Sequence, residues 1–239
     1  MKNKITLFLL PLLLLCSLQC SFSFASSTVD LSASAWRIAS TGSLSARRLL
    51  STSYRDGVYN QNAYFGTIHL KHDFFLFNIF LRATGLEYEA IVNERLTLTT
   101  RAPNLDLFFF PIRFSIFDIG GGAKAIQAKF IQDYHSTSLN ATLDYNVQLV
   151  VPMAYASVSF PLPISYRTKF NAVVLGMKKS DEANYLDVLA QAEYALVRTF
   201  SMALGYRYLS MRHKEVGTSE ELYFNFRFKG PFVQAAFNL

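Results

Sequence analysis

The last eight residues, 232–239, constrain the fold of this chain more than any other segment. They alternate between two faces of an extended strand, and one of these faces is entirely apolar. It consists of Val233, Ala235, Phe237 and Leu239, while Phe232 begins the opposite face. Because the chain stops with this strand, we expect no later segment to cover the apolar face in water. The pattern therefore predicts the lipid-facing closing strand of a membrane β-barrel, the strand by which such a barrel is recognised for insertion.

The N-terminus has the features of a secretory signal peptide. Lys2 and Lys4 precede a mostly apolar run over 5–15, and residues 23–25 (SFA) offer small residues at the two positions that a signal peptidase reads. The apolar run is too short for a transmembrane helix of about 20 residues, which is the alternative interpretation. We therefore expect residues 1–25 to be removed and residues 26–239 to form the barrel.

Both cysteines of the chain lie inside this predicted signal. Neither Cys16 nor Cys20 follows a small residue, so neither fits a lipid attachment site. The predicted mature chain contains no cysteine, which excludes disulfides, thiol catalysis and thiolate metal sites.

Alternation of apolar residues along the rest of the chain predicts the fold class. The sequence is 51% hydrophobic and 15% aromatic, yet beyond the signal no apolar run is long enough for a spanning helix. Repeated period-2 alternation favours an all-β, transmembrane, antiparallel up-and-down barrel. A soluble β-sandwich is the main competitor, but it needs fewer outward-facing Phe and Tyr residues.

Turn signals predict about ten strands. Four short turns are expected, together with five longer polar loops at about 38–62, 88–94, 133–140, 177–183 and 212–219. In such barrels the short turns lie on the periplasmic side, and we expect both termini there as well. Four short turns and two termini account for ten strand ends at that side, so ten strands are expected, an even number. Eight is the alternative if the first strand or the strand from Val147 is misassigned, and twelve if Gly230-Pro231 forms a hairpin. We otherwise expect Gly230-Pro231 to shift the register as a bulge.

Four short motifs resemble a known family. They are PMAY at 152–155, FPLP at 160–163, LGYR at 204–207 and FKGPF at 228–232. Together they resemble small proteobacterial outer-membrane β-barrel proteins of unassigned function. The resemblance implies a barrel in the Gram-negative outer membrane and no activity. This chain departs from the family in its basic rather than acidic loops and in ending with Leu239 rather than an aromatic residue.

Charged residues on the predicted inward faces are the main candidate site. They are Arg82, Asp106, Asp118, Lys124, Arg167, Lys169, Asp187, Glu193, Arg207 and Arg227. One hypothesis is a set of paired charges that fills a narrow lumen and leaves the protein a structural or surface-interaction role, without enzymatic activity. The alternative is a narrow pore for small solutes, including anions.

A hydrolase at the outer rim, acting on lipopolysaccharide or peptides, is a second alternative. Asp133, His135 and Ser136 share one predicted loop, and His213 and Glu215 share another. The sequence does not show whether these loops meet. His69 and His72 are three apart in a strand and face opposite sides, which argues against a shared metal. We expect no cofactor.

Basic residues of the first predicted loop suggest a partner. Arg47, Arg48 and Arg55 are placed to face lipopolysaccharide phosphates, which arginine binds bidentately. The expected partners are outer-membrane lipid and lipopolysaccharide, and during biogenesis the barrel-assembly machinery and periplasmic chaperones. We expect the protein to be a monomer. We expect no binding of nucleic acid, although the net charge is +6. Aromatic residues expected in interfacial girdles are Trp36, Tyr64, Tyr88, Tyr155 and Tyr208.

Overall fold

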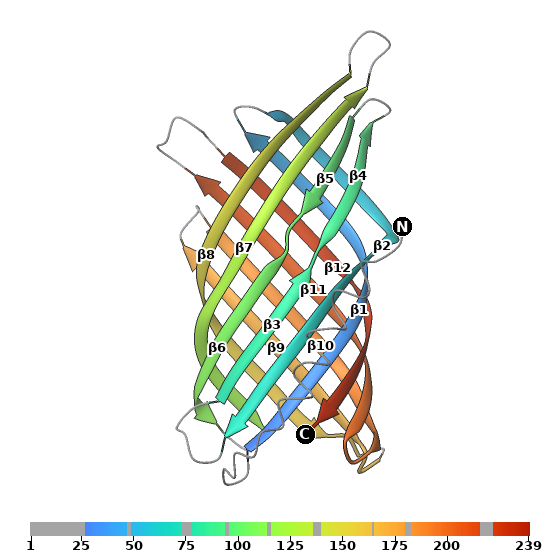
Figure 1. Cartoon of the computed structure of the whole chain (residues 1–239), viewed down its shortest axis with the longest axis vertical. Coiled ribbons are helices and arrows are strands. Elements are labelled where there is room, and N and C mark those ends of the chain that lie inside the picture. The colour runs from blue at the N-terminus through green and yellow to red at the C-terminus, as the bar shows by residue number, and fades with distance from the viewer. Residues whose placement is uncertain are drawn as a thin grey trace.

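The described part of the protein is one closed antiparallel barrel (Figure 1). The computed structural model describes residues 27–46, 49–72, 78–93, 96–113, 116–135, 140–163, 165–179, 183–215 and 222–239, so the predicted signal peptide at 1–25 lies outside it. Within these ranges, no helix is long and apolar enough to cross a membrane. The strands are β1 (Ser27–Ala46), β2 (Leu49–His72), β3 (Asn78–Gly85), β4 (Glu87–Asn93), β5 (Leu96–Arg101), β6 (Asn104–Arg113), β7 (Phe117–His135), β8 (Asn140–Pro161), β9 (Thr168–Lys179), β10 (Ala183–Val197), β11 (Phe200–Glu215) and β12 (Leu222–Asn238).

Twelve strand segments make ten strands of the barrel wall. Only Leu86 separates β3 from β4, and only Ala102 and Pro103 separate β5 from β6. The two interruptions lie side by side, because the Ala102 backbone N–H donates to the Leu86 carbonyl at 2.8 Å. Each strand pairs with its sequence neighbours, and β1 pairs with β12, so the barrel has no free edge. The prediction of a ten-strand up-and-down barrel is confirmed.

Exposed apolar side chains form a belt around the end of the barrel that carries the C-terminus. Figure 1 shows where this end lies. On β12 the outward residues Val233 and Phe237 are both 49% exposed, and on β11 the outward residue Leu204 is 68% exposed. Such a surface needs lipid around it, so this end of the barrel lies in the bilayer.

Most strands continue well past this belt. β8 has 22 residues and β2 has 24, about twice the length that a bilayer requires. The five long polar loops of the sequence analysis are therefore wrong in extent. Residues 38–46 and 49–62 belong to strands β1 and β2, and 88–93 belong to β4. Polar outward residues were interpreted as loop, whereas they are the water-facing side of strands beyond the membrane.

The two faces of a strand exchange polarity where the strand leaves the belt. β12 shows this most clearly, because Phe224, Phe226 and Phe228 are buried inside the barrel while Arg227 and Lys229 are exposed outside. No bulge causes the exchange. The register of β12 against β11 is the same at both ends of the pair, as it is on either side of Gly230-Pro231 against β1. The expected register shift is therefore wrong. Phe224, Phe226 and Phe228 face inward, and Arg227 and Lys229 face outward.

The Gly120–Gly122 segment of β7 lets two strands approach closely. A Cβ atom at Gly120 would collide with the Phe109 carbonyl, and one at Gly122 with the Leu107 carbonyl. These glycines allow β7 to bend against β6 beside the large side chains of Phe108 and Phe110.

Candidate functional site: a buried ion cluster across the lumen

Five charged side chains meet inside the barrel at the upper margin of the belt. Arg82 on β3, Asp106 on β6, Lys124 on β7, Asp187 on β10 and Arg207 on β11 are each at most 1% exposed. We call them the central ion cluster. Arg82, Asp106 and Lys124 are direct cross-strand neighbours, so one row of the sheet alternates in sign. Inward positions of five strands thus place these five side chains at the same height in the lumen.

The contacts of the cluster cross the lumen. Arg82 donates to Asp106 through Nε at 2.8 Å and reaches across to Asp187 through Nη2 at 2.5 Å. Arg207 holds both carboxylate oxygens of Asp187, with Nε at 3.1 Å from Oδ1 and Nη2 at 2.8 Å from Oδ2. Lys124 Nζ lies 2.5 Å from Asp106 Oδ1. The cluster therefore ties β3, β6 and β7 to β10 and β11 on the other side of the barrel.

The cluster carries one positive charge more than its carboxylates balance. Three cations face two carboxylates, and neutral acceptors stabilise the excess. Asn104 Oδ1 accepts from Lys124 Nζ at 3.1 Å, and Thr84 Oγ1 accepts from Arg207 at 3.3 Å. Aromatic faces contribute further, since electron-rich rings attract cations.

Arg207 is packed between two such rings. Its guanidinium carbon lies 4.9 Å from the ring centre of Trp36 and 4.7 Å from that of Phe65. Trp36 is completely buried, and its indole N–H donates to the Gly230 carbonyl at 3.1 Å. A Cβ at residue 230 would collide with the Arg37 carbonyl, so glycine is needed for this close approach. The aromatic clamp leaves Arg207 little freedom to move aside.

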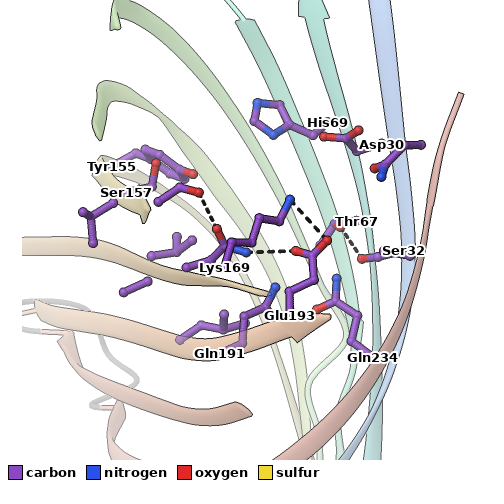
Figure 2. Close-up of a pocket in the computed structure, with 18 residues that line it drawn as sticks. Asp30, Ser32, Thr67, His69, Tyr155, Ser157, Lys169, Gln191, Glu193 and Gln234 are labelled. Carbon is purple, nitrogen blue, oxygen red and sulfur yellow. Dashed lines mark hydrogen bonds and ion pairs between the residues drawn. The ribbon is translucent and has the colours of Figure 1, made fainter. Parts of the chain in front are cut away.

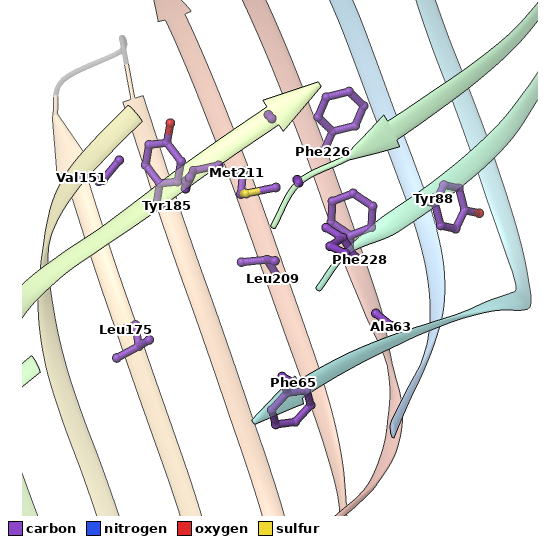
Figure 3. Packing of buried hydrophobic residues seen from close by; sticks show 14 of the residues in the cluster. Ala63, Phe65, Tyr88, Val151, Leu175, Tyr185, Leu209, Met211, Phe226 and Phe228 are labelled. Atoms are coloured by element: carbon purple, nitrogen blue, oxygen red, sulfur yellow. The ribbon is translucent and has the colours of Figure 1, made fainter. Parts of the chain in front are cut away.

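Toward the outer end, apolar side chains fill the lumen above the cluster. Figure 3 shows Phe226, Phe228, Tyr88, Leu209 and Met211 projecting from facing walls into the interior. Phe226 and Phe228 are fully buried, with ring centres 6.2 Å apart in a stacked arrangement. This half of the barrel has the packing of a soluble protein core.

Toward the periplasmic end, the lumen opens into a polar cavity of about 190 Å³ (Figure 2). Glu193 is its best-connected residue. It accepts from Ser201 Oγ at 2.7 Å and from Asn171 Nδ2 at 2.9 Å, and it pairs with Lys169 at 3.2 Å. Ser32 and Thr67 share a hydrogen bond on the opposite wall, where His69 packs against Phe80 and Phe110. None of the five residues of the central ion cluster lines this cavity.

The predicted inward charges fall into four groups. The five cluster residues and Glu193 are buried, Asp118 and Lys169 are partly exposed at the periplasmic end, and Arg167 lies exposed in the turn before β9. Arg227 is exposed on the outer surface, so its prediction as a lumen residue is wrong. The assignment failed because apolar residues were assumed to face outward along the whole of β12.

Three of the five aromatic residues expected in interfacial girdles line the lumen instead. Trp36, Tyr88 and Tyr155 are each at most 4% exposed, whereas Tyr64 is 62% exposed and Tyr208 is partly exposed on the outer wall. Strand parity predicts the correct side. Trp36, for example, follows the outward Ala35, so it must point inward.

The residues proposed for rim chemistry lie on separate strands. Asp133 is on β7, where it accepts from Thr142 Oγ1 at 2.7 Å, and His213 is on β11, where its ring packs 5.5 Å from that of Phe224. Three strands, β8, β9 and β10, separate β7 from β11 in the sheet. Ser136 and the side chains of His135 and Glu215 are outside the described part. Among the described residues, no group of His, Cys, Asp and Glu could hold a metal ion.

The basic residues expected in the first loop are mostly outside the described part as well. Arg47 and Arg48 belong to its gaps. Arg55 lies in β2 opposite Thr41 of β1, and nothing is described of its side chain.

Comparison with known proteins identifies the fold. No protein-family model matches the chain, and neither does any curated protein sequence. Among solved structures, the outer membrane protease OmpT from Escherichia coli aligns over 92% of this chain and 100% of its own, with 10% identity and a TM-score of 0.54. At this identity the likeness concerns the fold alone.

Two Neisserial barrels align over similar lengths with lower scores. The translocator domain of the autotransporter NalP from Neisseria meningitidis covers 90% of this chain and 89% of its own, with 11% identity and a TM-score of 0.45. Neisserial surface protein A covers 89% of this chain and 99% of its own, with 12% identity and a TM-score of 0.36. With its apolar belt and closed ten-strand wall, the protein is an integral outer-membrane β-barrel.

Proposed function

We propose that this protein is a closed, non-conducting barrel whose role is structural or interactive and resides in its outer surface. The observation that carries the proposal is the filling of the lumen. A permeating ion would have to pass the central ion cluster and then an apolar layer, and leaving water for such surroundings costs several kcal/mol.

The strand extensions support the same role. They hold a rigid polar surface beyond the membrane, and rigid elements position binding groups more precisely than loops do. Because pairing of β1 with β12 leaves no open edge, a single copy suffices for the barrel. Membership of the family of small barrels of unassigned function rests on the four sequence motifs alone.

A narrow pore is the second candidate, and the periplasmic cavity favours it. The cavity is polar and leads toward the cluster, whose excess positive charge would attract anions. Passage would require the aromatic clamp on Arg207 and the apolar layer above it to rearrange together.

Single-channel recording in a planar bilayer separates the two candidates. We expect wild-type protein to be silent, with insertion confirmed by heat-modifiable migration on gels. We expect conductance from a variant that thins both layers, Arg82→Ala combined with Phe226→Ala and Phe228→Ala. Steady conductance of the wild type, altered by Arg82→Ala alone, would establish the lumen as a pathway and refute the closed barrel.

A further inference from the structure

Four basic side chains gather on the outer wall just beyond the apolar belt. Arg212 and Lys214 lie on β11, and Arg227 and Lys229 lie on β12; all four are exposed. We call them the basic stripe. β11 and β12 are hydrogen-bonded neighbours (Figure 1). The stripe is therefore continuous across two strands.

The register places these charges close to one another. Ser210 pairs with Arg227, so Arg212 and Arg227 are diagonal neighbours, at about 7–8 Å by sheet geometry. Lys229 follows Arg227 on the same face of β12, and Lys214 follows Arg212 on β11. Like charges at this spacing repel, which destabilises the wall unless an anion lies between them.

No described acid compensates the stripe. Within the described ranges, none of the four residues forms an ion pair, and the outward faces of β10, β11, β12 and β1 carry no Asp or Glu. The other side of the barrel differs at the same height. There, Glu87 pairs with Arg101 at 2.9 Å and Lys129 with Asp144 at 3.1 Å. Unbalanced positive charge is thus a property of one side of the wall.

The height of the stripe indicates its partner. On the outward face of β11, Ser210 and then Tyr208 and Tyr206 lie below Arg212. On β12, Pro231 and Val233 lie below Lys229. Lys229 is therefore the first charged residue above the lipid-facing surface, at the level of headgroup phosphates. The start of β1 and the end of β12 lie together at the opposite end of the barrel, where Asp30 pairs with Asn238. Strand ends at that side are typical of the periplasmic end, so the stripe faces the outer leaflet.

We propose that the basic stripe binds the phosphate groups of lipopolysaccharide in the outer leaflet. This gives a partner to the outer surface on which the proposed function rests. Arg212 and Arg227 supply planar donors that match phosphate oxygens, and Lys214 and Lys229 supply additional positive charge. The adjacent belt holds the acyl chains of the same molecule, so one lipid contacts both surfaces.

Retention of lipid A on the refolded protein tests the proposal. The stripe variant is Arg212→Gln/Arg227→Gln/Lys229→Gln. The control variant, Arg101→Gln/Lys129→Gln/Lys178→Gln, removes the same charge from exposed or half-exposed positions elsewhere on the wall. Each is mixed in detergent with bisphosphorylated or dephosphorylated lipid A, and bound lipid is counted by native mass spectrometry. We expect the stripe variant to bind phosphorylated lipid A about tenfold more weakly at low salt, the sum of three exposed charge contacts.

The control variant should bind as the wild type does, and dephosphorylated lipid A should bind wild type and stripe variant equally. Equal losses in the two variants would show a general attraction to net charge and overturn the assignment to the stripe. Retention that does not depend on the phosphates would overturn the choice of ligand. Channel recordings keep the two proposals separate, because a silent barrel that binds no lipid A refutes only the stripe, and a conducting barrel that binds it refutes only the closed lumen.

Discussion

Removing one carboxylate from the central ion cluster should lower the free energy of unfolding far more than such a small change of side chain suggests. Asp187 receives two hydrogen bonds from Arg207 and one from Arg82, and it lies 3.9 Å from Lys124 Nζ. In Asp187→Asn, the three cations would face Asp106 alone, so the buried excess rises from one positive charge to two. Breaking a buried pair in this way typically costs about 3–5 kcal/mol, because an uncompensated charge remains.

Trp36 provides the assay. It is the only tryptophan of the chain, and its ring lies against Arg207. Its fluorescence therefore reports the cluster directly during equilibrium unfolding in urea. With an m-value of about 3 kcal/mol per M, we expect the midpoint of Asp187→Asn to fall by roughly 1–2 M.

Two further variants show whether charge is the cause. Asp187→Asn combined with Arg207→Met restores an excess of one positive charge and should recover about 2 kcal/mol of the loss, since removing both partners avoids a stranded ion. Arg101→Gln breaks an exposed pair, with side chains 52% and 58% exposed, and should cost below about 1 kcal/mol. The reasoning would be refuted if Asp187→Asn lowered the free energy of unfolding no more than Arg101→Gln does. It would also be refuted if the double variant were no more stable than Asp187→Asn alone.

Three other outcomes follow from the wall of the barrel. Leu204→Arg should lower the free energy of unfolding in lipid by about 2–4 kcal/mol, whereas Ser210→Arg, on the same face but above the belt, should change it by less than about 1 kcal/mol; urea titration in liposomes compares them. Gly230→Ala should impair folding because its methyl group collides with the Arg37 carbonyl, seen as loss of the heat-resistant band on gels. Deleting residues 232–239 removes the pairing of β12 with β1 and β11 at the periplasmic end, so protease protection in membranes should be lost; efficient insertion would contradict this.

The lower half of the barrel was predictable because one simple rule applies there. Lipid surrounds this half, so apolar residues face outward and polar residues inward, and alternation identifies both faces. Val233 and Phe237 on β12 and Asp187 and Glu193 on β10 were placed on the correct sides for this reason. The meeting of the cluster residues was also predictable in part, because the alternation placed each of them on the inward face of its strand.

The upper half could not be read by the same rule, since water surrounds it. There the outward face is polar and the inward face is apolar, as in a soluble sheet protein, although the strands are continuous. Applying the membrane rule to Phe226 and Arg227 inverted both residues and required a bulge that does not exist. Cross-lumen contacts such as Arg82 with Asp187 depend on barrel stagger, which a pattern along single strands does not contain.

The exchange of face polarity is itself a sequence signal, and it locates the cluster. On β11 the inward series changes from Arg207 to the apolar Leu209, while the outward series changes from Tyr208 to Ser210 and then Arg212. On β3 and β4 the inward series passes from Arg82 and Thr84 to Leu86, just where the outward series reaches Glu87. On these strands, the last inward charged side chains that the structure describes thus coincide with the membrane boundary.

This coincidence has a physical reason. Below the boundary, outward positions already carry the apolar residues, so the narrow lumen is filled with polar side chains that must satisfy one another. Above the boundary, the polar residues face outward and the lumen becomes an ordinary apolar core. Charges at the junction have water-accessible cavity below and packed hydrocarbon above, so they are stable only as a mutually paired cluster. The same junction on the outer wall carries Lys229 at the level of the headgroups, so one boundary in the sequence positions both the internal closure and the proposed lipid site.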